Sequence, residues 1–233
     1  MTAKTCLARL GRPVVVEVKS KSKQRRDQVN IRPISIKWRS DNGLVTRKPA
    51  YRTAIANVAY VWRDSQQIDQ FGKMPLAFEA RRFEIVHAGM MLPKSAPLWA
   101  CREPYSIWRE ADYHSSQEAD PCALSAWHVV LSLPTEARDG WKALVERFVG
   151  DQLVGRGAAV AWAIHACQGE DGDWLVHPHA HLIVSARTWR RTSDWGKRQT
   201  HWLGNRAQQA RFKSRWQDWL AYHEPSDKQY KSE

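Results

Sequence analysis

Hydrophobic and polar positions along this chain recur with two periods, and the change from one period to the other predicts its secondary structure. A period of two, or a short apolar run, predicts core strands over 32–38, 127–133, 158–164 and 179–186, with shorter strands over 14–18 and 83–86. Apolar residues three and four positions apart predict helices over about 50–67, 104–118, 135–154 and 205–222. This order of elements predicts an α+β fold in which helices pack on a central antiparallel sheet.

The net charge of the chain indicates which kind of partner it binds. The 233-residue chain is 43% hydrophobic, as a globular protein is, and its 36 Lys and Arg against 24 Asp and Glu give a formal net charge of +12. Between residues 188 and 215 there are eight basic residues and one acid, which leaves an excess of +7 (eight minus one). This balance favours a polyanion, and nucleic acid is the commonest one. Some of the 13 tryptophans would then stack on unpaired bases while others form the core.

The first 31 residues are expected to form a basic N-terminal extension. Five Lys and Arg lie between residues 19 and 26, either as a solvated arm or as contacts to a DNA backbone. No signal peptide is recognisable, and no apolar run approaches the ~20 residues that a membrane span needs. The four cysteines form no C-x-x-C pair, which favours reduced thiols. These features predict a cytoplasmic protein.

The sharpest chemical signal is the segment His177-Pro-His-Ala-His181. Residues two apart in a strand point to the same face, so His179 and His181 present their imidazoles side by side. His165 follows the strand over 158–164, and a turn rich in Gly and Asp at 169–173 leads to the next strand. If the two strands pair, His165 joins the other two. Three neutral imidazoles with open positions predict a divalent cation site.

Two nearby residues leave alternatives open. His177 shares the parity of His179 but lies before Pro178, so it either supports the site or is exposed. Cys167 would complete a His/Cys zinc site only with further ligands at recognisable spacings, and no second cysteine is near. Without a metal, the histidines would be ordinary strand residues.

Several segments resemble, in order, the motifs of MobA/MobL-type plasmid mobilisation relaxases, which belong to the HUH endonuclease superfamily. The first is the alanine-rich helical segment 54–64, AIANVAYVWRD, in which Tyr60 lies on the more polar flank. The next are VVLSLPTE over 129–136, AIHA over 163–166 and PHAHLIV over 178–184. The end of the chain, with Arg211 and Arg215-Trp216, is similar to the family's closing helix. The resemblance runs from about residue 32 to residue 222.

This resemblance implies an HUH relaxase domain over 32–222, flanked by the extension over 1–31 and a polar tail over 223–233. It implies that Tyr60 is the catalytic nucleophile and that His165, His179 and His181 bind Mg2+ or Mn2+. Tyr51, nine residues before Tyr60 on much the same helical face, is the chief rival nucleophile.

The strand over 127–133 contains both a match and a departure. Glu136 matches a family glutamate that would orient a histidine or the metal. Where relatives can carry acidic residues, this chain has His128 and Val130. His128 therefore either replaces the missing acid–base group or is simply packed.

The implied activity is site- and strand-specific nicking and religation of DNA in plasmid mobilisation, that is, conjugative transfer. A metal would withdraw charge from the scissile phosphate while the tyrosyl oxygen attacks phosphorus, leaving a 5′-phosphotyrosyl DNA and a free 3′-OH. The expected partners are single-stranded or supercoiled DNA at a transfer origin and accessory mobilisation proteins.

Basic and aromatic side chains are expected to hold the DNA strand, with Lys and Arg on phosphates and tryptophans on bases. Arg63 follows the tyrosine, and the other candidates lie in the basic stretch after residue 188. These residues are Arg63, Arg190, Arg191, Trp195, Lys197, Arg198 and Trp202.

Three other functions are compatible with parts of this pattern. Histidine-triad nucleotide hydrolases and transferases carry similar alternating histidines and would act on small nucleotides without a metal. A non-catalytic DNA-binding accessory protein would use the same basic patches without cleavage. An HUH nuclease of replication initiation or transposition would keep the chemistry in another setting. The Tyr60 helix, the His165 match and the net charge favour the relaxase.

Overall fold

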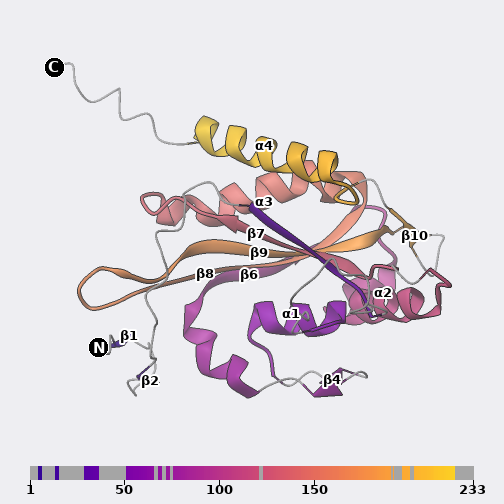
Figure 1. Ribbon diagram of the computed structural model, residues 1–233, viewed down its shortest axis with the longest axis horizontal. Coiled ribbons are helices and arrows are strands. Elements are labelled where there is room, and N and C mark those ends of the chain that lie inside the picture. The colour runs from indigo at the N-terminus through magenta and orange to yellow at the C-terminus, as the bar shows by residue number, and fades with distance from the viewer. Residues whose placement is uncertain are drawn as a thin grey trace.

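The computed structural model describes the central sheet, the helices packed on it and parts of the loops (Figure 1). The basic run over 19–26 and most of the polar tail lie outside the described residues. The described residues are 5–6, 14–15, 29–36, 51–65, 68–69, 72–73, 76–120, 123–189, 191, 196–199 and 202–223.

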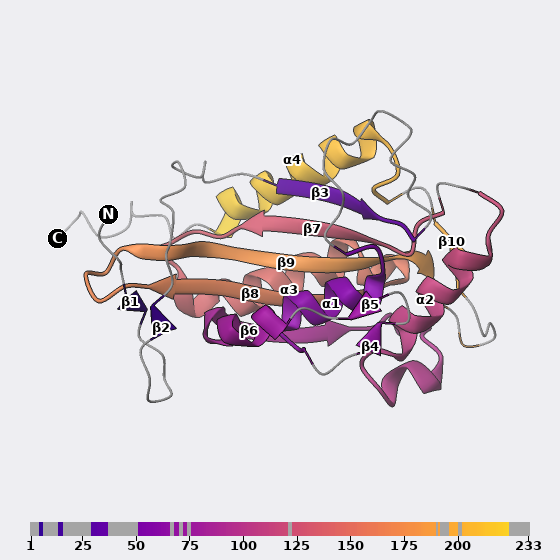
Figure 2. The same ribbon diagram turned by 60° about the horizontal axis from the view of Figure 1, so that its bottom comes forward.

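The centre of the fold is an antiparallel sheet with the strand order β3-β7-β9-β8-β6. Its strands are β3 (Val29–Ile34), β6 (Ile85–Met91), β7 (Ala126–Ser132), β8 (Ala158–Gln168) and β9 (Trp174–Thr188), and β10 (Lys197–Arg198) pairs with the end of β9. Figure 2 shows β8 and β9 extending together beyond their neighbours as a long hairpin. Two small pairs stand apart from this sheet: β1 (Thr5–Cys6) with β2 (Val14–Val15), and β4 (Ile68–Asp69) with β5 (Gly72–Lys73).

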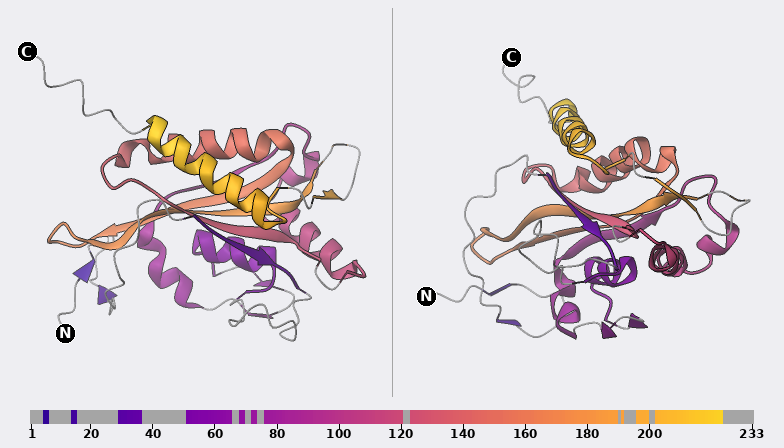
Figure 3. Two further views of the ribbon diagram at one scale, coloured as in Figure 1. Left: turned by 45° about the horizontal axis from the view of Figure 1, so that its top comes forward. Right: turned by 45° about the vertical axis from the view of Figure 1, so that its right-hand side comes forward.

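Helices cover both faces of the sheet, which confirms the predicted α+β class. On one face lie α3 (Trp141–Gln152) and α4 (Arg206–His223), and on the other lie α1 (Ala54–Trp62) and α2 (Ser106–Gln117), as Figure 3 shows. The 3-10 segments are η2 (Leu76–Glu84), η3 (Leu98–Cys101), η4 (Arg138–Gly140) and η5 (Val154–Arg156). Because successive strand residues point to opposite faces, Trp162 and Leu182 belong to one core while Ala163 and Ile183 belong to the other.

Tryptophans form much of the interior. Trp108, Trp141, Trp162, Trp189 and Trp216 are fully buried, so none of these five is available to stack on a base. The indole of Trp162 lies across the backbone of its strand partner at residue 89, which is a glycine. A Cβ added there would lie 3.0 Å from the indole, so any other residue would require the indole to shift.

The helix α1 is held firmly at both ends. At its N-terminus the Thr53 hydroxyl accepts the N–H of Ala56 at 3.1 Å, and the buried Asp112 carboxylate from α2 accepts the N–H groups of Ala54 (2.7 Å) and Ile55 (3.0 Å). These acceptors satisfy amides that have no partner within the helix. At the other end Arg63 adopts the left-handed conformation, with φ 53°, and closes the helix. A residue near the end of α1 is therefore placed with little freedom.

Several predicted boundaries shift. The strand predicted over 32–38 is β3 (Val29–Ile34), since the ladder ends where Ile34 pairs with Ala126, the first residue of β7. The strand predicted over 83–86 is the longer β6, and the helix predicted from residue 135 begins at Trp141, after a 3-10 turn. Within the described part of the chain, every helix is too short or too polar to cross a membrane.

Candidate active site

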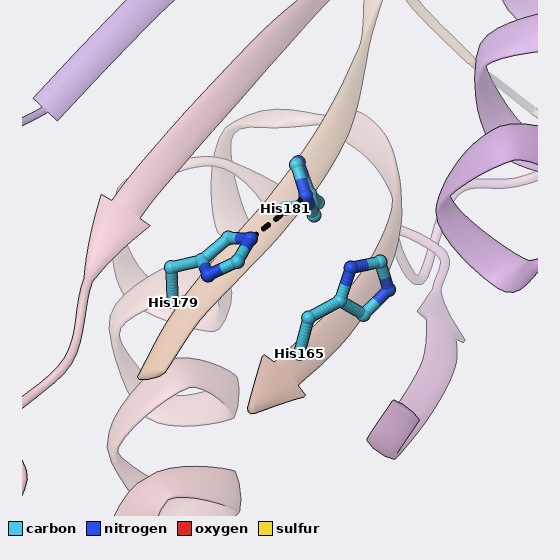
Figure 4. Close-up of side chains that lie close together, drawn as sticks. All are labelled: His165, His179 and His181. Carbon is cyan, nitrogen blue, oxygen red and sulfur yellow. Dashed lines mark hydrogen bonds between the residues drawn. The ribbon is translucent and has the colours of Figure 1, made fainter. Parts of the chain in front are cut away.

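Three histidines meet on the face of the sheet that α1 covers. His165 and His179 are directly paired across β8 and β9, and His181 lies two residues further along β9 on the same face. Their ring centroids are 4.7 to 5.7 Å apart, and Figure 4 shows the rings close together. One nitrogen from each lies within 4.8 Å of the others, a distance that a single metal ion can bridge. In the described part of the chain this is the one cluster of potential ligands, as the spacing of the histidines predicted.

Each of these rings has its other nitrogen engaged. Nδ1 of His179 donates to the carbonyl of His177 at 2.7 Å, and Nε2 of His165 donates to a carbonyl of α1 at 2.8 Å. Nδ1 of His181 lies 2.8 Å from Nε2 of His128. His177 therefore supports the site through its backbone, and its side chain is exposed. Of the three alternating histidines, only His179 and His181 join the cluster. This arrangement differs from the one expected for a histidine-triad nucleotide hydrolase or transferase.

Burial keeps these imidazoles neutral. It lowers the pKa of His165 from the ordinary 6.5 to about 3 and that of His128 to about 4. Burial also lowers the pKa of His179, and it lowers that of His181 well below the ordinary value. A neutral imidazole has a lone pair to offer a metal ion, so the donor set fits a divalent cation.

Tyr60 lies beside this cluster on the last turns of α1. Its ring centroid is 5.9 Å from that of His181, and the two rings are nearly perpendicular, at 80°. Phe78 and Tyr51 pack against other parts of the Tyr60 ring, with centroids at 5.1 and 5.7 Å. In the described ring contacts Tyr51 touches Tyr60 and Phe78 but no histidine. Of the two candidate tyrosines, Tyr60 is the one next to the histidines.

Arg63 connects the tyrosine with the histidines from below the surface. It is 2% exposed, and its guanidinium carbon lies 4.7 Å from the centroid of the Tyr60 ring. Nη2 is 2.9 Å from a carboxylate oxygen of Glu84 and 3.3 Å from Nδ1 of His165. Glu84 is also buried and accepts a second hydrogen bond, from Arg81 at 2.6 Å. This placement argues against the predicted contact of Arg63 with DNA, because the guanidinium faces Glu84 and the histidine cluster.

Two further residues considered from the sequence lie outside the histidine cluster. Glu136 is exposed, lies four residues beyond the end of β7, and is outside the cluster that could hold a metal. Cys167 is disulfide-bonded, with a partner outside the described side chains. It is therefore no zinc ligand, and the expectation of reduced thiols is wrong for this residue.

The predicted DNA-binding residues separate into different environments. Arg190 and Trp195 lie outside the described residues. Arg191 and Lys197 are exposed. Arg198 forms ion pairs with Glu118 at 3.0 Å and Asp120 at 2.7 Å, while Trp202 is partly buried against the core under α4. Arg191 and Lys197 are therefore the members of this set whose surroundings best suit a contact with phosphate.

Sequence reasoning missed Glu84 and Arg32. Glu84 comes from a segment expected to form a short strand, and a buried acid there has no local signal. Arg32 pairs with His128 in the register of β3 and β7, so its exposed side chain stands at the sheet edge on the face of the histidines. Only the register, which depends on distant strands, places it there.

The fold is an antiparallel sheet with helices on both faces. Three clustered imidazoles, two of them buried, lie on this sheet beside a tyrosine from a separate helix and form a candidate metal-and-tyrosine active site. The model of the MobA/MobL family matches residues 52–232, and the chain belongs to this family. A solved structure from work on the molecular basis of vancomycin resistance transfer in Staphylococcus aureus is similar, with a TM-score of 0.59 and 17% sequence identity. The similarity covers 85% of this chain and 94% of that one, which shows a common fold. No curated protein matches the chain in sequence.

Proposed function

We propose that this protein is a mobilisation relaxase, a metal-dependent nickase and ligase that cuts one DNA strand at a specific site in a transfer origin. The observation that carries the proposal is that the Tyr60 ring lies beside His181, which is one of the three clustered imidazoles. Family membership supports the same activity. The enzyme would act in the cytoplasm on single-stranded or supercoiled DNA, with accessory mobilisation proteins.

His165, His179 and His181 would hold the cation. Imidazole donors suit transition ions better than the oxygen-preferring Mg2+, so Mn2+ is the better candidate of the two. When bound, the cation supplies Lewis-acid polarisation of the scissile phosphate. The sheet's contribution is to hold the three nitrogens in place before the DNA arrives.

Tyr60 would be the nucleophile. Its hydroxyl oxygen loses a proton and forms a bond to phosphorus, while the bond from phosphorus to the 3′ oxygen breaks and that oxygen takes a proton. The product is a 5′-phosphotyrosyl DNA and a free 3′-OH, with the number of phosphoester bonds unchanged. The reverse attack by the 3′-OH therefore religates the strand. Arg63 supports the tyrosine ring from one side, and Glu84 compensates the charge of Arg63.

Exposed basic side chains would hold the DNA on either side of the scissile bond. Arg32 lies at the edge of the sheet on the face of the histidines. At the far end of the strands is a hollow of about 810 Å³, and the cations that line it are Lys94, Arg156 and Lys197. Phosphate contacts of this kind give sequence-independent affinity that weakens with salt.

The direct test is formation of the covalent adduct. The protein is incubated with Mn2+ and single-stranded oligonucleotides that tile the DNA beside its gene, and protein bound to the 5′ end of a product is detected by denaturing gel. Tyr60→Phe should abolish the adduct, because it removes the attacking oxygen and keeps the ring. Tyr51→Phe is the matched control and should retain it. An adduct that still forms with Tyr60→Phe would mean that another residue is the nucleophile. An adduct lost only in Tyr51→Phe would identify Tyr51 as the nucleophile.

A further inference from the structure

His181 differs from the other two candidate ligands in what holds its ring. His179 and His165 each donate to a backbone carbonyl, those of His177 and Val61. Nδ1 of His181 instead meets the side chain of His128, at 2.8 Å. A side-chain substitution can therefore release His181 alone, while the bonds to backbone carbonyls remain.

The sheet register places His128 in this position. His181 pairs with Val130 across β7 and β9, and His128 pairs with Ile183. His128 and His181 are thus diagonal neighbours on one face, a distance that ring side chains can span. Their ring centroids are 5.0 Å apart. His128 does not belong to the ligand cluster itself.

The hydrogen bond determines which nitrogen of His181 is free. A neutral histidine carries one proton on its two ring nitrogens. Nε2 of His181 faces Nε2 of His179 at 3.1 Å, on the side where a cation would be shared. If Nε2 is to offer its lone pair, the proton of His181 must be on Nδ1 and must be donated to His128. If Nε2 of His128 donated this hydrogen bond instead, the proton of His181 would be on Nε2 and would point at the cation.

We infer that His128 is a positioning residue: its Nε2 accepts the Nδ1–H of His181 and so holds the ligating tautomer and the angle of that ring. The inference rests on the proposed metal-dependent function. Partners of this kind fix the orientation of metal-bound histidines in general, and carboxylates are common among them. A neutral imidazole in this place adds no negative charge, so it leaves the full charge of the cation to act on a phosphate.

Metal affinity is the first test. Mn2+ binding is measured by titration calorimetry on the wild type, His128→Phe and His128→Gln. His128→Phe keeps a flat ring but has no acceptor, and it should weaken Mn2+ binding about 10- to 100-fold. His128→Gln keeps an acceptor oxygen and should recover most of the affinity. His87→Ala removes an exposed histidine of β6 and should leave Mn2+ binding unchanged.

The tautomer of His181 is the second test and needs no variant. Long-range 1H–15N correlation spectra of the wild type loaded with diamagnetic Zn2+ in place of Mn2+ should show both His181 and His128 protonated on Nδ1, so that Nε2 of His128 is the acceptor. A wild-type His181 protonated on Nε2 would overturn the inference. So would a folded His128→Phe that binds Mn2+ as tightly as the wild type.

The two proposals can fail separately. If the wild type binds Mn2+ and forms the adduct while His128→Phe binds Mn2+ equally well, only the role of His128 is wrong. If the wild type binds no Mn2+, both the metal centre and the role of His128 are wrong.

Discussion

The Arg63 side chain joins parts of the site that lie far apart in the sequence. Its Nη1 donates to the carbonyl of Tyr60 at 3.3 Å, and its Nη2 reaches both Glu84 and Nδ1 of His165. Because Nε2 of His165 is bonded to a carbonyl, Nδ1 is the nitrogen that remains for a cation. A bound cation and Arg63 would therefore compete for one lone pair, and Glu84 gives the displaced guanidinium an anionic partner. The left-handed backbone of Arg63, which costs a non-glycine residue roughly 1 kcal/mol, is retained at this junction.

The lowered pKa values of the histidines predict how stability depends on pH. In the folded protein His165 and His128 stay neutral down to about pH 3 and about pH 4, whereas in the unfolded chain they take up protons near pH 6.5. Stability is therefore complete above pH 6.5 and falls as the pH drops from 6.5 toward 4. The expected slope is roughly 1.4 kcal/mol per pH unit for each such histidine.

Urea denaturation at pH 7, 6 and 5 measures this slope. His128→Gln removes one of these imidazoles and should flatten the slope, while the surface variant His87→Ala should not. Equal slopes for the wild type and His128→Gln would contradict the lowered pKa of His128.

Individual site residues differed in how far the sequence could predict them. His165, His179 and His181 were predictable, because strand periodicity and a short hairpin fix their relation locally. The roles of His128, Glu84 and Arg63 were not, since each depends on contact between segments remote in sequence. A family motif places Arg63 near the tyrosine, but it does not say that the side chain turns inward.

The position of the tyrosine depends on the helix α1 as a unit. Its N-terminus is anchored to α2 through Asp112, and its last turn contacts β8 through the bond from His165 to the Val61 carbonyl. The indole N–H of Trp62 adds a further bond, to the carbonyl of Trp162 at 3.1 Å. The helix is thus fixed to the sheet on the same side as the histidines.

Removing the Asp112 anchor should destabilise the protein and disturb the tyrosine. Asp112→Ala leaves two buried amides without their carboxylate acceptor, and we expect a loss of about 3 kcal/mol in the free energy of unfolding. Urea denaturation measures it. Asp151→Ala, at an exposed position on α3, should change stability by less than about 0.5 kcal/mol. A loss as small for Asp112→Ala as for this control would mean that the anchor contributes little.

At this scale the sequence predicts the type and order of the elements better than their ends. The core strands and the four helices exist where the periodicity places them. The ends of β3 and α3 differ because ladder partners and a 3-10 turn decide them, and neither leaves a local pattern.

Across the whole molecule, a group of cations lies at the end of the strands that is remote from the histidine cluster. The pair of His165 with His179 and the pair of Ala158 with Thr188 are seven residues apart along β8, or ~23 Å at ~3.3 Å per residue. The basic hollow lined by Lys94, Arg156 and Lys197 lies beside the second pair. DNA rises 3.4 Å per base pair, so ~7 base pairs would span this distance.

Whether the hollow contributes to DNA binding should therefore depend on the length of the DNA. The triple variant Lys94→Gln, Arg156→Gln and Lys197→Gln should weaken binding of DNA that extends at least ~7 base pairs beyond the scissile bond. It should also lower the slope of log affinity against log salt by up to about 3, close to one for each cation. Fluorescence anisotropy across a salt series measures both quantities.

A matched triple variant controls for net charge. Arg138→Gln, Lys142→Gln and Arg147→Gln removes three exposed cations from η4 and α3 that do not line the hollow. If both triple variants weaken binding alike, the effect comes from overall charge and not from the hollow.

The long central strand β9 limits where this protein can gain or lose residues. Because its side chains alternate between the tryptophan-rich core and the histidine site, one inserted residue after His181 would reverse every later position. The tip of the β8–β9 hairpin, Gly169 to Asp173, lies beyond the last strand pair, which is Gln168 with Trp174, and it is largely exposed. Insertions and deletions among relatives should therefore gather at this tip, and a tag or fluorescent label spliced there should leave the imidazoles in register.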